Sequence, residues 1–165
     1  MIKKDFPSVR LVVVPRHPER ANKIKALFLN MGSKSIYENE EEISADILIV
    51  KSLGILPALY AEAQLAFVGG SLVNRGGHNI IEPAIAQCPF ILGEHYFNFK
   101  NIVESFISAN ATHIVRTPLD IFELFSKTYK NQDDLREIMI RNANTVVEKN
   151  IGATMRQLSL IRARL

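Results

Sequence analysis

"LAFVGGSLVNRGGHNIIEPAIAQ", residues 65–87, is the stretch that decides the fold. Its first part, 65–70, is a short apolar run typical of a strand that is covered on both faces. Two glycine pairs follow, and residues 80–87 then have the apolar pattern of a short helix. A strand that leads through a loop into a helix is half of a βαβ unit, which indicates a parallel sheet.

The same alternation runs along the rest of the chain. Gly32 is the expected stop of the first helix, and Pro118 is expected near the start of a later one. The chain pattern therefore predicts an α/β fold with a doubly wound parallel sheet, in a single domain over residues 1–165. The predicted strands are 10–15, 34–38, 46–51, 65–70, 90–93 and 112–117. The predicted helices are 18–32, 55–64, 80–87, 97–110, 118–130 and 133 onward, with a break near Gly152 and a last helix to Leu165.

Composition describes a soluble globular protein, with 47% hydrophobic and 22% charged residues. No segment approaches the roughly 20 apolar residues of a membrane helix, and MIKKDFPSVR at the N-terminus lacks the apolar core of a signal peptide. A single cysteine, Cys88, favours a reducing compartment and no chemical role.

Charge is modest and unevenly spread. The net charge of +3 and the pI of about 9.1 are too small to indicate nucleic-acid binding. The acidic run ENEEE, residues 38–42, is expected to be a solvated connection. A basic tail carries Arg156, Arg162 and Arg164; a solvated helix face is favoured there over contact with an anionic partner or a bilayer.

Ligands of such sheets bind beyond the carboxyl ends of the strands, which here means the loops after Val14, Val50 and Val68. The first loop places Arg16 and His17 there, a pair of side chains suited to phosphate or carboxylate. Pairing of Arg16 with Glu19 is an equally good interpretation of that loop alone. The second loop contains Gly54, which permits an otherwise disfavoured turn and is weak evidence by itself.

The third loop is rich in glycine. Gly69–Gly70 and Gly76–Gly77 let the main chain approach a ligand and present amides to it, and a helix is expected to begin near Asn79. An anion, most naturally a phosphate, is the physical match. The spacing fits neither the dinucleotide fingerprint nor a P-loop, so NAD and a Walker-type triphosphate site are not supported.

Polar side chains of this loop have competing interpretations. Ser71 and Asn79 are neutral hydrogen-bond donors, and His78 is ordinarily structural, although its place between a glycine pair and a helix start is unusual. Asn79 and Glu82 resemble a capping box, which would make both structural. Alternatively, Pro83 begins the helix and leaves Glu82 free to accept hydrogen bonds from ligand hydroxyls. The local pattern favours the cap.

Several kinds of site are absent from the sequence. No set of His, Cys, Asp and Glu has metal-ligand spacing, and the nucleophile elbow G-x-S-x-G does not occur. We therefore expect no metal site and no hydrolase.

Together these segments resemble the C-terminal half of the 3-deoxy-D-manno-octulosonic acid (Kdo) transferases of lipopolysaccharide synthesis. The resemblance rests on VPRHPER (14–20), LYAEAQLAFVGGS (59–71), FVGGSLVNRGGHNIIEPA (67–84) and HYFNF (95–99). The chain departs from the family at Ile80 and Glu94, where proline is common. Glu94 adds a negative charge near the expected anion site.

The resemblance implies a Rossmann-like domain that forms the C-terminal half of a GT-B glycosyltransferase. The donor would be CMP-Kdo, the acceptor a lipid A precursor, and no cofactor would be needed. Arg16 and His17 would contact the CMP portion, and Gly54 and Gly70 would allow close approach of the backbone. Ser71 and the Gly76–Gly77 backbone would hold the phosphate, beside His78 and Asn79 at the helix start. Glu82 would bind ribose hydroxyls, which reverses the local preference for a cap.

The resemblance implies that the family's general base and its acceptor-binding, membrane-anchoring segment belong to an N-terminal domain, which we expect to be absent here. We therefore expect no catalytic residue in this chain, and a soluble domain that binds nucleotide weakly and transfers no sugar alone. The full-length protein would act at the cytoplasmic face of the bacterial inner membrane, with the basic C-terminal helix as an additional contact. Two alternatives stay open: half of a UDP-sugar glycosyltransferase or epimerase, and a non-catalytic module whose glycine loop packs against a partner.

Overall fold

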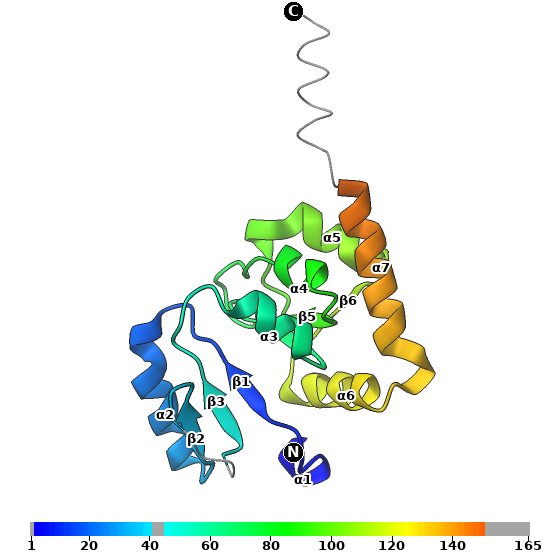
Figure 1. Ribbon diagram of the computed structural model, residues 1–165. Helices are drawn as coiled ribbons and strands as arrows, with labels where there is room; N and C mark the ends of the chain where they lie inside the picture. Colours follow the sequence, from blue (N-terminus) through cyan, green and yellow to red (C-terminus); the bar gives the residue numbers. More distant parts are fainter. Residues whose placement is uncertain (1, 41–44, 151–165) are drawn as a thin grey trace, which may run out of the picture. The chain divides into compact units, whose positions relative to one another are not determined.

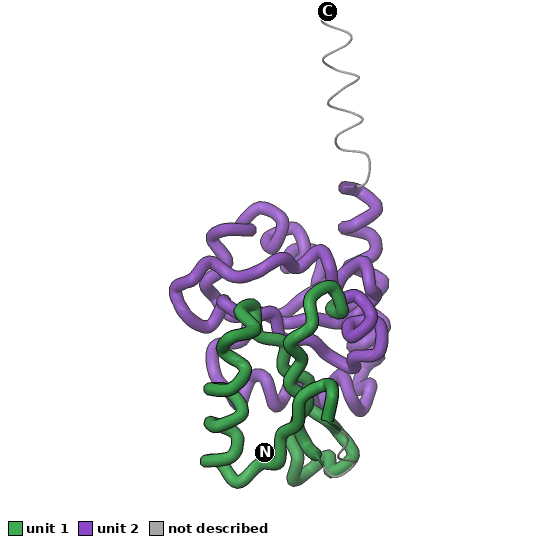
Figure 2. The backbone as a smooth tube through the Cα atoms, turned by 60° about the vertical axis from the view of Figure 1, so that its left-hand side comes forward, with its two compact units in different colours: residues 1–56 green, residues 57–165 purple. Residues whose placement is uncertain are grey.

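The computed structural model describes residues 2–40 and 45–150. Its contacts divide the chain into two compact units, Met1–Leu56 and Pro57–Leu165, which Figure 2 distinguishes by colour. Each unit is described by itself. The predicted break at Gly152, the last helix and the basic residues Arg156, Arg162 and Arg164 lie outside the described residues.

The first unit is a small parallel sheet with one long helix against it. The strand order is β1-β3-β2, and Leu48 of β3 is in register with Val12 of β1 and Ile36 of β2. Ile47 and Ile49 of the central strand pack with Ala21, Ile24 and Phe28 of α2 (Figure 1). The strands are β1 (Leu11–Val13), β2 (Ser35–Tyr37) and β3 (Ile47–Ile49), and the helices are α1 (Ile2–Asp5), the 3₁₀ turn η1 (Pro18–Arg20) and α2 (Ala21–Asn30).

The ends of the helices follow local sequence signals. Gly32 follows α2 with a φ of 72°, and the amide of Ser33 donates to the carbonyl of Phe28, so the predicted stop is confirmed. Helix α6 (Pro118–Tyr129) begins with proline at its first position, as predicted. Thr117 and Asp120 form a capping box in front of it, and the hydrogen bond from the Arg116 amide contributes most to lowering the pKa of Asp120. Helix α1 was not predicted from the sequence.

The second unit is a parallel sheet with helices on both faces. Its strand order is β4-β5-β6, with Phe67, Ile91 and His113 in register. The strands are β4 (Ala66–Val68), β5 (Phe90–Leu92) and β6 (Thr112–Ile114). The helical elements are α3 (Leu56–Glu62), which begins at the unit boundary, α4 (Ile81–Ile85), η2 (Phe97–Phe99), α5 (Lys100–Ser108), α6 (Pro118–Tyr129), η3 (Gln132–Asp134) and α7 (Leu135–Asn150).

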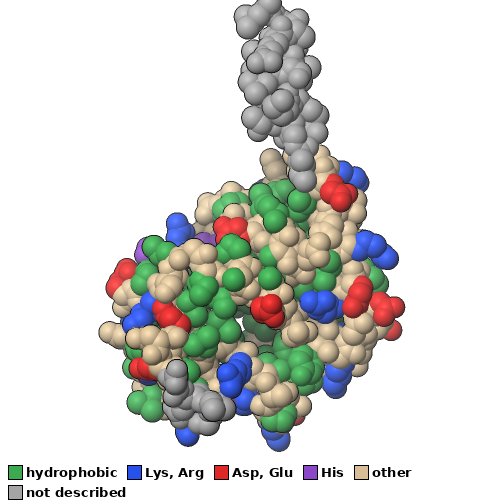
Figure 3. All heavy atoms as spheres, in the orientation of Figure 1, with side chains coloured by type: hydrophobic (Ala, Val, Ile, Leu, Met, Phe, Trp, Pro, Cys, Tyr) green, Lys and Arg blue, Asp and Glu red, His purple; other side chains and the backbone are tan. Residues whose placement is uncertain are grey.

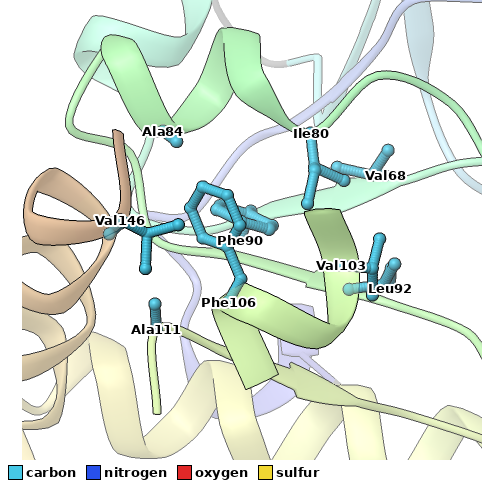
Figure 4. Packing of buried hydrophobic residues seen from close by; sticks show 10 residues of the cluster. Val68, Ile80, Ala84, Phe90, Leu92, Val103, Phe106, Ala111 and Val146 are labelled. Atoms are coloured by element: carbon cyan, nitrogen blue, oxygen red, sulfur yellow. The ribbon is translucent and has the colours of Figure 1, made fainter. Parts of the chain in front are cut away.

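The main core of this unit lies between its sheet and helices α4, α5 and α7 (Figure 4). Phe90 of β5 and Phe106 of α5 are fully buried and meet edge to face, with ring centroids 5.4 Å apart. Truncating either ring to alanine would cost about 3–5 kcal/mol of stability. A second cluster, which includes Val115 and Met139, packs with α6 residues, so α7 contributes to both cores. These two clusters hold the sheet of the second unit in place, and the glycine-rich loop begins where strand β4 of this sheet ends.

The predicted α/β class with parallel strands is confirmed, and all six predicted strands are present. Hydrogen bonds group the strands into two three-stranded sheets, one in each unit. That the six strands belong to one doubly wound sheet in a single domain stays a prediction.

The lone cysteine is part of the interior. Cys88 is buried, and burial raises the pKa of its thiol to about 11. Because the thiolate is the reactive form, this thiol is chemically inert at neutral pH. Its burial agrees with the expectation that Cys88 has no chemical role.

No described helix combines the length and the apolar character that crossing a membrane requires. On the face shown in Figure 3, acidic and basic side chains are interspersed among hydrophobic ones.

His113 on β6 makes stability depend on pH. Its Nε2 atom is buried without a hydrogen-bond partner among the described residues. Burial lowers the pKa of His113 below its ordinary value of 6.5, and the positive charge of Lys127 lowers it further. A histidine with a depressed pKa contributes stability that is complete above its ordinary value and is lost as the pH falls through its lower value in the folded state.

We therefore expect the free energy of unfolding to fall between pH 7.5 and pH 5, and to fall less in His113→Gln. Urea unfolding at a series of pH values measures this dependence. The same substitution at His17, whose side chain is exposed, is the control. An equal pH dependence in His113→Gln and the parent would contradict the assignment.

Candidate functional site

In the first unit, the carboxyl ends of all three strands lie at one edge of the sheet because the strands are parallel. Arg16 and His17 follow β1 and are exposed, as a ligand contact requires. The Glu19 carboxylate, considered as a partner for Arg16, lies 3.6 Å from Nδ1 of His17. Gly54, in the loop after β3, has a φ of 79°, so the predicted turn that only glycine adopts easily is confirmed.

Glu38, which we had not considered for the site, also lies at this edge. It directly follows β2, and its carboxylate accepts hydrogen bonds from the Lys51 amide at 2.9 Å and from the Ser52 amide at 3.0 Å. Burial alone would raise the pKa of Glu38, but these hydrogen bonds outweigh burial and lower it. Glu38 therefore holds the start of the loop that contains Gly54.

The described part of the acidic run ENEEE agrees with its interpretation as a solvated connection, because Glu38, Asn39 and Glu40 are all exposed after the end of β2. Besides the bonds of Glu38, Glu40 forms an ion pair with Lys25 at 2.7 Å. The next two acidic residues, 41 and 42, lie outside the described residues. A position immediately after a strand end was the signal that could have identified Glu38.

In the second unit, the glycine pairs shape the loop after β4. Gly70, Gly76 and Gly77 have φ values of 73°, 81° and 75°, in the left-handed region that favours glycine. The Gly77 amide donates to the Gly70 carbonyl at 3.0 Å and so brings the two pairs together. Gly76 and Gly77 are themselves buried. The backbone conformation of the loop by itself explains these glycines. They would in addition allow a ligand to approach the main chain closely.

His78 packs against the first glycine pair. A Cβ atom on Gly70 would lie 3.1 Å from Nε2 of the His78 ring. The imidazole is half-buried and flanks Gly70. Its place in the loop thus has a structural reason, and a ligand contact by His78 stays a prediction.

Ser71 lies wholly inside the unit. Its hydroxyl donates to the Val68 carbonyl at 2.6 Å and accepts from the Gly93 amide at 2.8 Å, while the side chain is fully buried. Ser71 thereby ties the loop after β4 to the loop after β5. A contact between this hydroxyl and a phosphate, as we expected, would require the hydroxyl to leave one of these partners.

Asn79 and Glu82 form a pair at the start of α4. The Asn79 side chain accepts from the Ile81 amide at 3.0 Å and donates from Nδ2 to Oε1 of Glu82, also at 3.0 Å. The N-cap position is Ile80, without a side-chain cap bond, and Asn79 lies one residue before it. Glu82 bonds the Asn79 side chain and not its backbone, so the reciprocal capping box is not formed. Glu82 is exposed, and no other described residue hydrogen-bonds its carboxylate.

The helix begins at Ile81, close to the expected start near Asn79. The alternative in which Pro83 starts the helix is wrong, because Pro83 is its third residue. The proline is tolerated there because the first-turn amides lack intrahelical partners in any helix. With only five residues, α4 has a small dipole, and attraction of an anion depends on the loop amides more than on the helix.

Two further residues modify the surroundings of this loop. Tyr60 on α3 has a pKa raised to about 12, first by burial and then by the negative charge of Glu82. Glu94, which we expected to oppose an anion, forms an ion pair with Arg116 at 3.1 Å that offsets its charge. Neither contact has a signal in the local sequence pattern.

The structure thus brings together the predicted site residues of the glycine-rich loop, from Gly70 to Glu82. Arg16, His17 and Gly54 share the strand-end edge of the first unit. Across residues 2–40 and 45–150, no group of three or more His, Cys, Asp and Glu side chains is placed to hold a metal ion.

Comparisons with known proteins identify relatives that share most of this chain. It is 32% identical to the 3-deoxy-D-manno-octulosonic acid transferase of Haemophilus influenzae over 97% of its length, and 33% identical to that of Bordetella pertussis over 94%. The chain spans only 38% and 37% of these two relatives. No protein-family model matches the chain.

A solved structure extends the comparison to the fold. The C-terminal CMP-Kdo binding domain of WaaA from Acinetobacter baumannii superposes with a TM-score of 0.82 at 30% identity. The match covers 88% of this chain and 77% of that domain. The chain therefore belongs to the 3-deoxy-D-manno-octulosonic acid transferase family, in the part that corresponds to the C-terminal domain.

Proposed function

We propose that this chain binds CMP-Kdo and is the donor-binding half of a Kdo transferase that acts on a lipid A precursor. The observation that carries the proposal is the exposed Asn79–Glu82 pair at the end of a glycine loop held by internal hydrogen bonds. The similarity to a CMP-Kdo binding domain supports the choice of ligand. A binding loop that is already folded loses little conformational freedom when ligand arrives.

The two ends of the glycine-rich loop would bind different parts of the nucleotide, because only one end carries a negative charge. Glu82 would repel a phosphate but accepts hydrogen bonds from ribose hydroxyls, which are neutral donors. The phosphate then belongs at the other end, near the glycine backbone. Arg16 and His17, exposed at the strand-end edge of the first unit, would contact the CMP portion.

Sugar transfer requires an acceptor hydroxyl that is deprotonated and in line with the anomeric carbon, and stabilisation of the departing CMP phosphate. Backbone amides and Arg16 suit the last task. The general base and the acceptor site would come from the part of the family's proteins that this chain does not span. On this proposal, the chain alone binds nucleotide weakly and transfers no sugar, while the whole transferase works at the cytoplasmic face of the bacterial inner membrane.

Titration of the ¹⁵N-labelled chain with CMP tests the proposal. We expect the amide resonances of residues 69–80 to shift with CMP, and to shift less with UDP at the same concentration. UDP is the comparison because it is the nucleotide of the alternative UDP-sugar donors; it differs from CMP in its base and carries one more phosphate.

Two results would count against it. Resonances of the loop that stay unmoved at saturating CMP would exclude the site, and a stronger response to UDP would favour half of a UDP-sugar enzyme.

Glu82→Gln tests the role of the carboxylate. The variant keeps the shape of the side chain but loses the charge that strengthens hydrogen bonds from ribose hydroxyls, so we expect CMP affinity to fall about tenfold. The free energy of unfolding should change by less than about 0.5 kcal/mol, since the side chain is exposed. Calorimetric titration and urea unfolding measure the two quantities.

Glu62→Gln is the matched control, because it makes the same change at an exposed position on α3. If Glu82→Gln instead loses about 0.5–2 kcal/mol of stability and keeps its affinity, Glu82 is only a helix cap.

A further inference from the structure

The motif HYFNF, residues 95–99, follows β5 and packs against the glycine-rich loop at two places. At the first, the amides of Gly93 and His95 donate to the hydroxyl and carbonyl oxygens of Ser71, at 2.8 and 2.9 Å. At the second, Asn98 bonds two successive peptide groups. Its backbone amide donates to the Gly76 carbonyl at 3.2 Å, and its side-chain Nδ2 donates to the Arg75 carbonyl at 3.1 Å.

Asn98 also fits against the glycine at this position. A Cβ atom on Gly76 would overlap the Asn98 side-chain amide and would lie 2.7 Å from the Phe97 ring. Gly76 is buried and has a φ of 81°, so a side chain there is excluded both by conformation and by space. The second glycine pair and Asn98 are therefore complementary parts of one arrangement.

The two bonds of Asn98 determine where the neighbouring amides point. In a trans peptide the N–H lies opposite to the C=O. Because the Arg75 carbonyl faces Asn98, the Gly76 N–H faces away from it, and the same holds for the Gly77 N–H, which donates to Gly70. No described residue accepts a hydrogen bond from the Gly76 amide. A buried amide of this kind normally has a partner.

We propose that Asn98 is a positioning residue for nucleotide binding, which holds the Arg75–Gly76 peptide so that its N–H is presented to an anionic group of the ligand. The proposal rests on the proposed function and names a residue that function did not include. Asn98 acts through the loop, because its side-chain donor is engaged by Arg75 and its backbone donor by Gly76.

Asn98→Asp in the full chain tests this role. The aspartate has nearly the same shape, but it cannot donate to the Arg75 carbonyl and repels it. We expect the Gly76 and Gly77 amide resonances to shift in the ligand-free variant, and CMP affinity to fall about tenfold. Asn101→Asp, the same change three residues further along at an exposed position, should have neither effect.

A folded state is verified by urea unfolding, and affinities are compared at a temperature where every variant is folded. If Asn98→Asp does not fold, Asn98→Ala removes the donor without adding charge. With it we expect the same two resonances to shift and affinity to fall about threefold to tenfold.

The outcomes separate this proposal from the proposed function. Absence of CMP binding by the parent chain would overturn both. CMP binding by the parent, with affinity in the Asn98 variants within twofold of it, would overturn the positioning role alone. Weaker binding with unmoved Gly76 and Gly77 resonances would mean that Asn98 contacts the ligand directly, and would also overturn the positioning role.

Discussion

A single buried hydroxyl links the two loops on which the candidate site depends. Ser71 donates to the Val68 carbonyl and accepts from the Gly93 amide, and its own carbonyl accepts from His95. A Cβ atom on Gly93 would overlap the Ser71 carbonyl and lie 2.6 Å from the Leu72 nitrogen, so this contact also fixes the identity of Gly93. Leaving a buried hydrogen-bonding group without its partner costs about 1–3 kcal/mol. Any other arrangement that broke these bonds would therefore be less stable by at least that amount.

From this connection the shape of the glycine-rich loop follows outward. Gly77 donates to Gly70, and Asn98 bonds the carbonyls of Arg75 and Gly76. The exposed polar groups, Asn79 and Glu82, then lie at the end of a backbone that is held from within. Hydrogen bonds within the loop and from Asn98 thus give the loop its shape, while Asn79 and Glu82 stay exposed to a ligand.

Sequence periodicity was sufficient for the six strands and the longer helices, but not for helix α1 or for the site's internal contacts. Strands such as β5 and helix signals such as Gly32 and Pro118 act over a few residues, so they can be read locally. The glycine pairs were singled out for close approach of a ligand, which stays a prediction, and part of the reason for Gly76 lies in Asn98, 22 residues further along the chain. Glu38 and Tyr60 depend likewise on partners that only folding brings near. Contacts between residues that are far apart along the chain produce no periodic pattern in the sequence, so they could not be predicted from it.

The account claims that the loop is folded before any nucleotide arrives, and native-state hydrogen exchange of the ligand-free chain tests this most directly. The amides of Gly77, Gly93 and His95 donate to interior acceptors, so they should exchange much more slowly than those of Leu72 and Val73, whose side chains are exposed. Equally fast exchange at all five positions would mean that the loop is not held by these bonds, and would contradict the account.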